Sequence, residues 1–320
     1  MTSFSIKQLS QKLTAGLAFV LIATSQAFAV TVEDSLGKHE FSQPATRVIT
    51  LNWGATEEVL ELGVTPVGIA DIQGYKTWVA RPEVPDGVID VGTRAEPNVE
   101  RLAELKPDLI IVGSMQQDMV ARLSPIAPVL YFDNYRADHS NIQAIEHSFI
   151  ELGKALGKGE EAKNRLKERD QILADLKRKV WQHFNGQPPK VGVARFGDAN
   201  HARVYGDNSM PTAALDALGL KAALDIPSTT WGQVQKPIRD LAYLDGVLLY
   251  IRPLPNEDEL FKRPLFRMMP FVSEGRIAPV KATWTYGGAL SIRYLAEHFV
   301  DALTSMPADI QTAKSHGAAN

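Results

Sequence analysis

The sequence predicts an α/β protein of two doubly wound lobes joined by a long rigid helix, with a ligand cleft between the lobes. Two observations predict this fold: short apolar runs alternate with helical patterns in two separate stretches, and a long helical run without glycine or proline lies between them. Apolar strands separated by helices are typical of parallel sheets covered on both faces. The predicted divisions are 1–29, a signal peptide; 30–139, a first lobe; 140–186, linking helices; and 187–320, a second lobe.

The first lobe has two helical patterns with recognisable ends. One helix is expected to stop at Gly63 and the other before Pro107, because glycine favours a helix C-terminus and proline cannot continue a helix. Strands are predicted at 48–51, 67–70, 109–112 and 129–132, and helices at 56–62 and 97–105.

The linking region consists of an amphipathic helix at 140–156 and a second helix at 160–184. The second helix would span roughly 35–40 Å, more than the radius of a small domain. It could be a crossover within one large domain, but strand–helix alternation restarts after it, which favours two lobes. In the second lobe, strands are predicted at 191–194 and 247–251, and helices at 210–218 and 290–303. Ligands of such sheets bind beyond the carboxyl ends of the strands, which places the cleft between the lobes.

Residues 1–29 have the order of a secretory signal peptide. Lys7 and Lys12 precede an apolar stretch at 15–23, and Ser25-Gln26-Ala27-Phe28-Ala29 provides a small-residue cleavage site. The alternative, a buried N-terminal helix, does not account for this order. Because the chain has no cysteine, it has neither disulfides nor a lipid-attachment site, so we expect an unanchored protein of the Gram-negative periplasm.

Composition and motifs argue against several classes of protein. The net charge is −3 with no basic cluster, which makes nucleic acid an improbable partner. There is no P-loop, no G-x-S-x-G and no dinucleotide fingerprint, and the seven histidines lack metal-ligand spacing. We therefore predict neither an enzyme nor a resident metal or cofactor.

Aromatic residues recur where strands end or loops begin. Trp53, Trp78, Trp231, Trp284 and Tyr286 all have this placement, whereas Trp181 lies in the long helix and is expected to pack there. Side chains at the carboxyl ends of strands would project into the cleft, where tryptophan and tyrosine suit a bulky amphipathic ligand. The alternative is that each ring only covers its own lobe.

Three arginines follow predicted strands. Arg94 comes after Val88-Ile89-Asp90-Val91-Gly92 and could donate two fixed hydrogen bonds to ligand oxygens, or pair instead with Glu96 or Asp90. Arg195 and Arg252 end strands of the second lobe. Together the three arginines would make the cleft positive in a protein that is negative overall.

Three segments resemble the ferric-hydroxamate (ferrichrome-type) periplasmic siderophore-binding proteins. These are VIDVGTRAEPN at 88–98, MPFV followed by GR within 269–276, and WTYG at 284–287. The resemblance runs from 47 to 303. The phrase LAELKPDLI at 102–110 is shared by the wider helical-backbone superfamily of metal, siderophore and vitamin B12 binding proteins, so it indicates the fold and not the ligand.

The resemblance implies a class III periplasmic binding protein that delivers a ferric siderophore to an inner-membrane ABC permease. The siderophore itself coordinates the iron, so the protein need supply no metal ligand. Arg94 would bind the hydroxamate oxygens, and Glu100 would dock on arginines of the permease. A monomer is expected. The cleft walls would be formed by Trp78, Trp231, Trp284 and Tyr286, with Trp53 and Tyr75 beside them.

The chain departs from the resemblance in three ways. Gly113-Ser114-Met115-Gln116 stands where ferrichrome binders have a tyrosine, so one ligand hydrogen bond is either lost or replaced, with Gln116 as the candidate replacement. The permease-facing acid of the second lobe has only an offset counterpart, Asp240. Finally, Arg195 and Arg252 lie where binders of neutral ligands lack arginine, which suggests an anionic ligand such as a citrate-hydroxamate siderophore.

Other functions fit parts of the pattern. A haem or cobalamin carrier of the same fold could use Tyr75, Tyr135 or Tyr286 near the ligand, since haem wants an axial tyrosine or histidine. A periplasmic hydrolase would need a nucleophile and a base, and none is recognisable as a pair. A sensor partner that signals instead of transporting would present the same docking surface.

Overall fold

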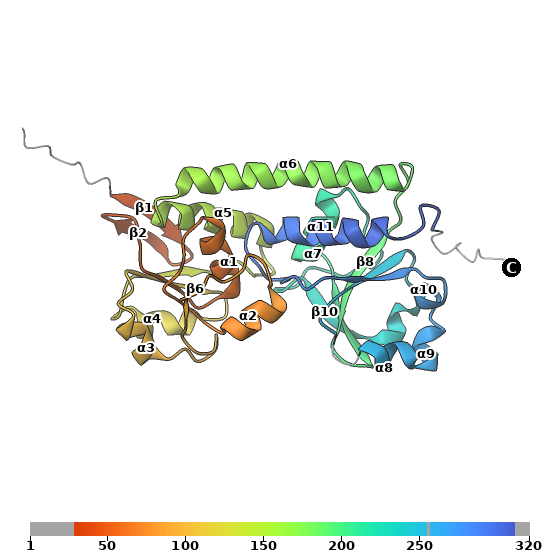
Figure 1. Ribbon diagram of the computed structural model, residues 1–320, viewed down its shortest axis with the longest axis horizontal. Helices are drawn as coiled ribbons and strands as arrows, with labels where there is room; N and C mark the ends of the chain where they lie inside the picture. Colours follow the sequence, from red (N-terminus) through yellow and green to blue (C-terminus); the bar gives the residue numbers. More distant parts are fainter. Residues whose placement is uncertain (1–28, 255–256, 311–320) are drawn as a thin grey trace, which may run out of the picture.

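The computed structural model describes residues 29–254 and 257–310, so all but the last residue of the predicted signal peptide lies outside the described residues. Two α/β lobes lie side by side beneath one long helix, α6 (Gly159–His183), which runs over both of them (Figure 1). The two-lobed α/β fold class predicted from the sequence is confirmed. None of the described helices combines the length and apolar character needed to cross a membrane.

The first lobe is built on a parallel five-stranded sheet. Its order is β5 (Ile89–Asp90), β4 (Gly68–Ile69), β3 (Val48–Thr50), β6 (Leu109–Gly113) and β7 (Val129–Phe132). The surrounding helices are α1 (Trp53–Glu61), α2 (Ile72–Trp78), α3 (Val99–Glu104), the short η1 (Gln117–Met119) and α4 (Val120–Leu123). A hairpin of β1 (Val30–Asp34) and β2 (Gly37–Phe41) was not predicted, and its first strand packs against α5 (Asn141–Ala155).

The second lobe has a mixed sheet, which corrects the prediction of parallel sheets in both lobes. The strand order is β10 (Gln233–Pro237), β9 (His201–Tyr205), β8 (Val191–Phe196), β11 (Val247–Ile251) and β12 (Ile277–Val280). β9 is antiparallel to both β8 and β10. The loop from β8 to β9 is too short for a parallel crossover, so these strands form a hairpin. The helices are α7 (Met210–Ala217), η2 (Ile238–Tyr243), α8 (Glu257–Lys262), α9 (Pro264–Arg267), α10 (Pro270–Ser273) and α11 (Ser291–Thr304).

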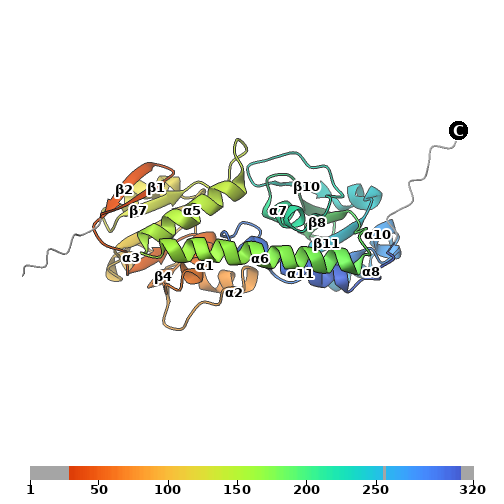
Figure 2. The same ribbon diagram turned by 90° about the horizontal axis from the view of Figure 1, so that it is seen from above.

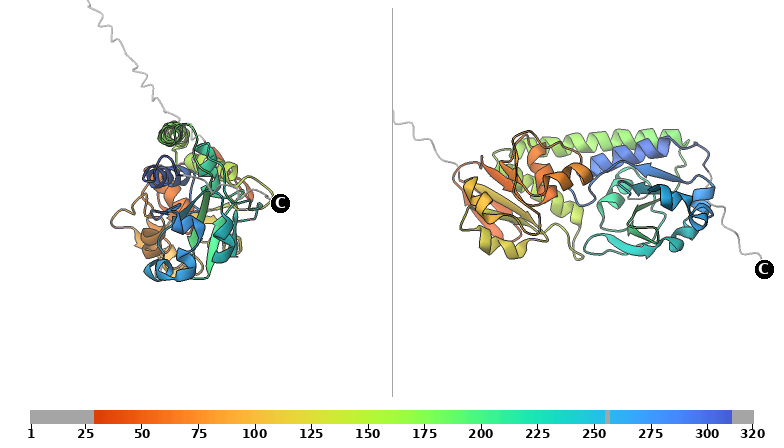
Figure 3. Two further views of the ribbon diagram at one scale, coloured as in Figure 1. Left: turned by 90° about the vertical axis from the view of Figure 1, so that its right-hand side faces the viewer. Right: turned by 60° about the horizontal axis from the view of Figure 1, so that its bottom comes forward.

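Helix α6 is packed against both lobes along its length. Its 25 residues span about 38 Å at 1.5 Å per residue. It contacts α5 in the first lobe and α7 and α11 in the second, and Figure 2 shows it crossing from one lobe to the other. The end-on view in Figure 3 shows α6 outermost with α11 beneath it. One apolar core runs through both lobes, because Val48 of β3, Val180 of α6 and Phe299 of α11 belong to the same buried cluster.

Arg169 fixes α6 at the boundary between the lobes. This side chain is almost fully buried. One guanidinium nitrogen donates to the carbonyl of Ala289, just before α11, at 3.0 Å, and another lies 2.6 Å from a carboxylate oxygen of Glu146 on α5. One arginine therefore ties together the long helix, the first lobe and the start of α11.

Buried carboxyl groups of α1 cross the lobe boundary to the start of α11. Glu57 accepts hydrogen bonds from the Gly288 N–H at 2.7 Å and from the Ser291 hydroxyl at 2.8 Å. Glu58 accepts from the Ala289 N–H at 3.2 Å. These backbone donors lie in the segment just before α11, and their hydrogen bonds offset the cost of burying the carboxyl groups. Burial raises the pKa of Glu58 to about 8 and holds the pKa of Glu57 well above its ordinary value. We call this contact the α1–α11 clasp.

A second tie joins the lobes on the opposite side of the cleft. Asn141, buried at the start of α5, donates from its backbone N–H to the side-chain oxygen of Asn208 at 2.8 Å. Its side-chain amide donates to the carbonyls of Asn208, at 2.9 Å, and Thr230, at 3.1 Å. These bonds fix the segment that carries Trp231 against the first lobe.

Gly288 leaves room for the α1–α11 clasp, and we expect Gly288→Ala to destabilise the protein. A methyl group there would overlap Cγ of Glu58 and approach the Gly54 carbonyl oxygen to 3.0 Å. The expected loss of unfolding free energy is about 1–3 kcal/mol, measured by denaturant unfolding. Gly159→Ala, whose methyl group meets only ordinary contacts, should change stability little. Equal stability of the two variants would contradict close packing at the clasp.

The raised pKa of Glu58 predicts a pH dependence of stability. Between pH 4.5 and 8 the unfolded chain loses this proton while the folded protein keeps it, so unfolding free energy falls as pH rises through this window. Glu58→Gln preserves an oxygen acceptor for Ala289 but cannot titrate, and should make the fall shallower. Glu100→Gln, at an exposed carboxyl, should keep the wild-type slope. An unchanged slope in Glu58→Gln would mean that Glu58 is ionised in the fold.

Candidate functional site

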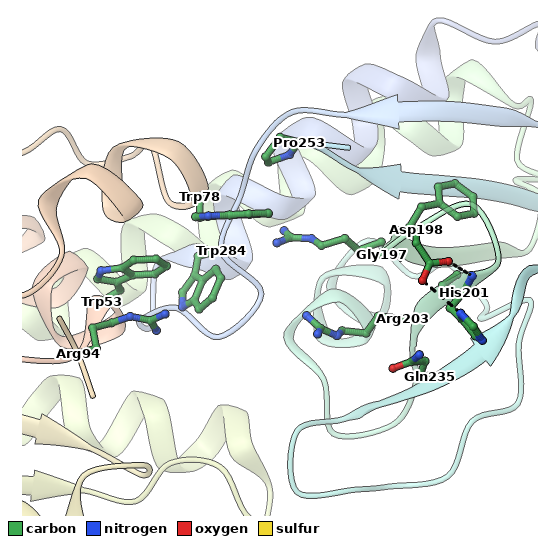
Figure 4. Close-up of a pocket in the computed structure, with 13 residues that line it drawn as sticks. Trp53, Trp78, Arg94, Gly197, Asp198, His201, Arg203, Gln235, Pro253 and Trp284 are labelled. Carbon is green, nitrogen blue, oxygen red and sulfur yellow. Dashed lines mark hydrogen bonds and ion pairs between the residues drawn. The ribbon is translucent and has the colours of Figure 1, made fainter. Parts of the chain in front are cut away.

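The candidate site is a cleft between the lobes, made of two adjoining cavities. The larger, about 500 Å³, is lined by Trp53, Trp78, Arg94 and Trp284 on one side and by Arg195, Arg203, Asp198, His201 and Gln235 among others on the opposite side (Figure 4). The smaller, about 270 Å³, shares Arg94, Arg203 and Trp284 with it and adds Tyr135, Trp231 and Tyr286. A volume of this order suits a ligand the size of a cofactor or a large chelate.

Aromatic rings form a continuous wall from one cavity to the other. Trp284 lies edge-on to Trp53, with ring centroids 4.8 Å apart, and 5.3 Å from Tyr286. Tyr286 in turn lies 5.4 Å from Trp231, which stacks on Tyr135 at 5.2 Å. Edge-to-face and stacked pairs at these distances stabilise one another, so the wall keeps its shape without a ligand.

The tryptophans reach the wall from different elements. Trp53 begins α1 directly after β3, and its indole N–H donates to the Ala70 carbonyl at 3.2 Å. Trp284 and Tyr286 lie in the segment that precedes α11, where the clasp fixes Gly288. Trp78 was predicted to lie in a loop, but it is the last residue of helix α2, whose N-cap is Asp71. Helix α2 was not predicted because it is only seven residues long and contains Gly74, which is unfavourable inside a helix.

Arg94 lies against the aromatic wall. Its guanidinium carbon is 3.6 Å from the ring centroid of Trp53, within the range of a cation–π contact. The nearest acid is Asp71, at 3.9 Å from Nε, and not the Glu96 or Asp90 considered from the sequence. Burial lowers the pKa of Arg94 from its usual value, and the negative charge of Asp71 only partly offsets this by raising it. The side chain remains 36% exposed, so its N–H groups are available to a ligand.

Arg195 faces Arg94 from the second lobe. Its side chain is nearly buried, with one Nη donating to the Thr283 carbonyl at 3.1 Å and the guanidinium 5.0 Å from the ring centroid of Trp78. Within the described part of the chain, the Nε atom has no hydrogen-bond partner. Burial lowers the pKa of Arg195. A buried donor without a partner is costly unless a ligand supplies the acceptor.

Arg203 and Tyr135 line the cleft but were not chosen as ligand-binding residues from the sequence. Arg203 lies in β9, a strand that was not predicted, directly opposite Arg195 in the β8–β9 ladder. Tyr135 was considered only as a haem ligand, and its hydroxyl donates to the Gly287 carbonyl at 3.2 Å. The sequence signal that could have revealed Arg203 is the alternation of polar and apolar residues at 201–205, which follows the strand at 191–196 after a short loop.

Three of the predicted ligand-binding residues are misplaced. Tyr75 is fully buried and donates to the Pro82 carbonyl, because α2 turns it into the first lobe. Gln116 is also buried, and its amide binds the Gly113 N–H and the carbonyls of Leu51 and Arg94. It therefore positions the Arg94 backbone and does not replace a ligand-binding tyrosine. Arg252 is held by Glu257 of α8 at 2.5 Å and does not line either cavity.

The two predicted docking acids lie on exposed surfaces outside the cavities. Glu100 is in the first turn of α3 in the first lobe. Asp240 is in η2 of the second lobe, with Arg239 at 3.7 Å. Within the described residues, no group of three or more histidine, aspartate or glutamate side chains could hold a metal ion.

Comparisons with known proteins agree on one family. A family model described as periplasmic binding protein matches residues 48–282. The iron(3+)-hydroxamate-binding protein FhuD of Escherichia coli is 32% identical over 268 residues, which cover 83% of this chain and 88% of that protein. The Fe(3+) dicitrate-binding periplasmic protein FecB of Escherichia coli is 29% identical over 281 residues, covering 83% of this chain and 87% of FecB.

A solved structure shares both the fold and much of the sequence. It is the Fe3+–Desferal-bound siderophore-binding protein FhuD from Vibrio cholerae. The similarity has a TM-score of 0.80 and 40% sequence identity, and it covers 81% of this chain and 98% of that one.

Gln116→Met should destabilise the protein even though the substitution keeps the length of the side chain. It would leave the Gly113 N–H and the Leu51 and Arg94 carbonyls without their buried partner. We expect a loss of about 2 kcal/mol or more in unfolding free energy, measured by urea denaturation. Gln117→Met, at the exposed neighbour, is the matched control. If both variants unfold alike, Gln116 does not hold the Arg94 backbone.

Proposed function

The chain belongs to the periplasmic binding protein family, and on that basis we propose that it captures a ferric hydroxamate siderophore in the interlobe cleft and delivers it to an ABC importer of the inner membrane. Iron–siderophore binding is the activity named for the relatives just described. Their ligands include hydroxamate and citrate complexes of iron, so the hydroxamate class is our proposal for this chain.

The observation that carries the proposal is the position of the Arg94 guanidinium over the ring of Trp53 and near that of Trp284. Its distances to the two ring centroids are 3.6 and 5.5 Å. A ferric hydroxamate has an oxygen-rich iron centre with an apolar ligand backbone around it. The guanidinium can donate to the hydroxamate oxygens, while the indoles contact the apolar backbone. Because those oxygens already surround the iron, this binding requires no metal ligand from the protein, and no catalytic step is part of the proposal.

Transport requires a docking surface as well as a cleft. We propose that Glu100 and Asp240, exposed on different lobes, contact basic residues of the permease. Rim charges of this kind mainly orient partners and speed their association. Export to the periplasm by the sequence at 1–29 and action as a monomer complete the proposal.

Titration of tryptophan fluorescence tests the ligand class. The wall contains Trp53, Trp231 and Trp284, so ferrichrome or ferrioxamine B should quench the emission saturably. Arg94→Gln should weaken binding of these complexes about tenfold or more, because it removes a charged donor from the hydroxamate oxygens. Arg122→Gln, on the exposed face of α4, makes the same charge change and should bind as the wild type does.

Other outcomes of the titration would overturn the assignment in distinct ways. Saturable quenching by haem or cobalamin alone would retain the fold and replace the ligand. Quenching by ferric hydroxamates that is equally strong in Arg94→Gln would retain the ligand class and remove Arg94 from the binding site. No response to any ferric hydroxamate would contradict the proposed function.

A further inference from the structure

Two arginines stand opposite each other on the second-lobe side of the cleft. Arg195 of β8 and Arg203 of β9 are direct partners in an antiparallel ladder. Side chains in such positions have Cβ atoms about 4.5–5.5 Å apart, and like charges there repel. The partner of Arg203 on its other side is Gln235 of β10, which brings no compensating charge. The sheet therefore holds two adjacent positive charges at the wall of the larger cavity, which both residues line.

No carboxylate among the described residues neutralises this pair. Within the described part of the chain, neither Arg195 nor Arg203 forms an ion pair with a carboxylate. Of the residues that the structure describes, Asp198 is the only acidic one lining either cavity. Its carboxylate accepts from the backbone N–H groups of Asn200 and His201, at 2.6 and 2.8 Å, and contacts the His201 ring (Figure 4). It is thereby engaged within its own loop.

Arg195 also has unused hydrogen-bonding capacity in this position. Its Nε is buried and has no hydrogen-bond partner among the described residues, while one Nη is held by the Thr283 carbonyl. The held Nη fixes the guanidinium in one orientation beside Trp78. Arg203 has no side-chain hydrogen bond in the described structure and is exposed to the cleft. One arginine is thus pre-positioned and the other is free to adapt to an anion.

We propose that the siderophore carries ionised carboxylate groups and that the Arg195–Arg203 pair binds them. This inference rests on the proposed function and assigns its ligand to the carboxylate-bearing ferric hydroxamates. Guanidinium groups match carboxylates in shape and charge, and two of them together neutralise a ligand that carries more than one negative charge. Arg94 and the tryptophans would hold the hydroxamate–iron part, so the bound ligand would have one orientation between the lobes.

The proposal replaces Arg252 with Arg203 as the partner of Arg195. From the sequence, Arg195 and Arg252 were the two arginines that suggested an anionic ligand. Glu257 already neutralises Arg252. The arginine that the fold leaves without a compensating carboxylate is Arg203 of β9. The β8–β9 hairpin brings Arg203 to the position opposite Arg195.

Comparison of two probes tests the inference. Ferric aerobactin is a citrate-based hydroxamate complex with free carboxylates, and ferrichrome is a neutral hydroxamate complex. The wild-type protein should bind ferric aerobactin more tightly than ferrichrome, as measured by fluorescence titration. Arg203→Gln should weaken ferric aerobactin binding about tenfold or more and ferrichrome binding no more than about twofold. Raising the salt concentration should weaken binding of ferric aerobactin more than that of ferrichrome, because only ferric aerobactin carries ionised carboxylates.

The control is Arg239→Gln, which makes the same change of net charge at an exposed site outside both cavities. It should leave the affinity for both complexes unchanged. Equal weakening of both probes in Arg203→Gln, or tight ferrichrome binding with no advantage for ferric aerobactin, would overturn the inference and leave the proposed function intact. Failure of ferric aerobactin to bind would also overturn the inference, whereas failure of ferric aerobactin, ferrichrome and ferrioxamine B alike would refute the proposed function as well.

Discussion

The α1–α11 clasp is the contact on which the geometry of the cleft depends. Glu57 and Glu58 belong to the first lobe, whereas Gly288, Ala289 and Ser291 lead into a helix of the second. Burying two carboxyl groups is unfavourable unless hydrogen bonds satisfy them, and here two backbone N–H groups before α11 and the Ser291 hydroxyl do so. The segment just before these residues carries Trp284 and Tyr286, so the clasp sets the position of two of the five rings of the aromatic wall.

The cleft combines two kinds of surface that usually exclude each other. Stacked indole and phenol rings create an apolar environment, and burial there makes charge unfavourable, as the lowered pKa values of Arg94 and Arg195 reflect. Yet the lining has three arginines against one aspartate. Such a site binds weakly to simple anions, which prefer water, and to neutral apolar molecules, which leave the arginines unsatisfied. It favours a ligand that presents both an apolar backbone and concentrated negative oxygen.

Local patterns in the sequence predicted most of the fold. The strands 129–132 and 247–251 and the helix over 160–184 agree with β7, β11 and α6 to within a residue, because each has a strong periodicity or a clear end. Side-chain positions could not be predicted where local folding or packing decides them. Tyr75 does not line the cleft because α2 buries it, and Gln116 does not because three backbone groups bind its amide. Arg203 was missed because only the β8–β9 hairpin places it beside Arg195.

The continuous core beneath α6 also bears on how a bound molecule would leave. In a protein whose lobes swing on a flexible hinge, thermal opening alone frees the ligand. Here one apolar cluster, Arg169, the clasp and the Asn141 contacts hold the lobes from several sides. Opening the cleft would break these contacts together, so spontaneous unloading should be slow. Release of the ligand would then require a partner protein that binds both lobes and separates them.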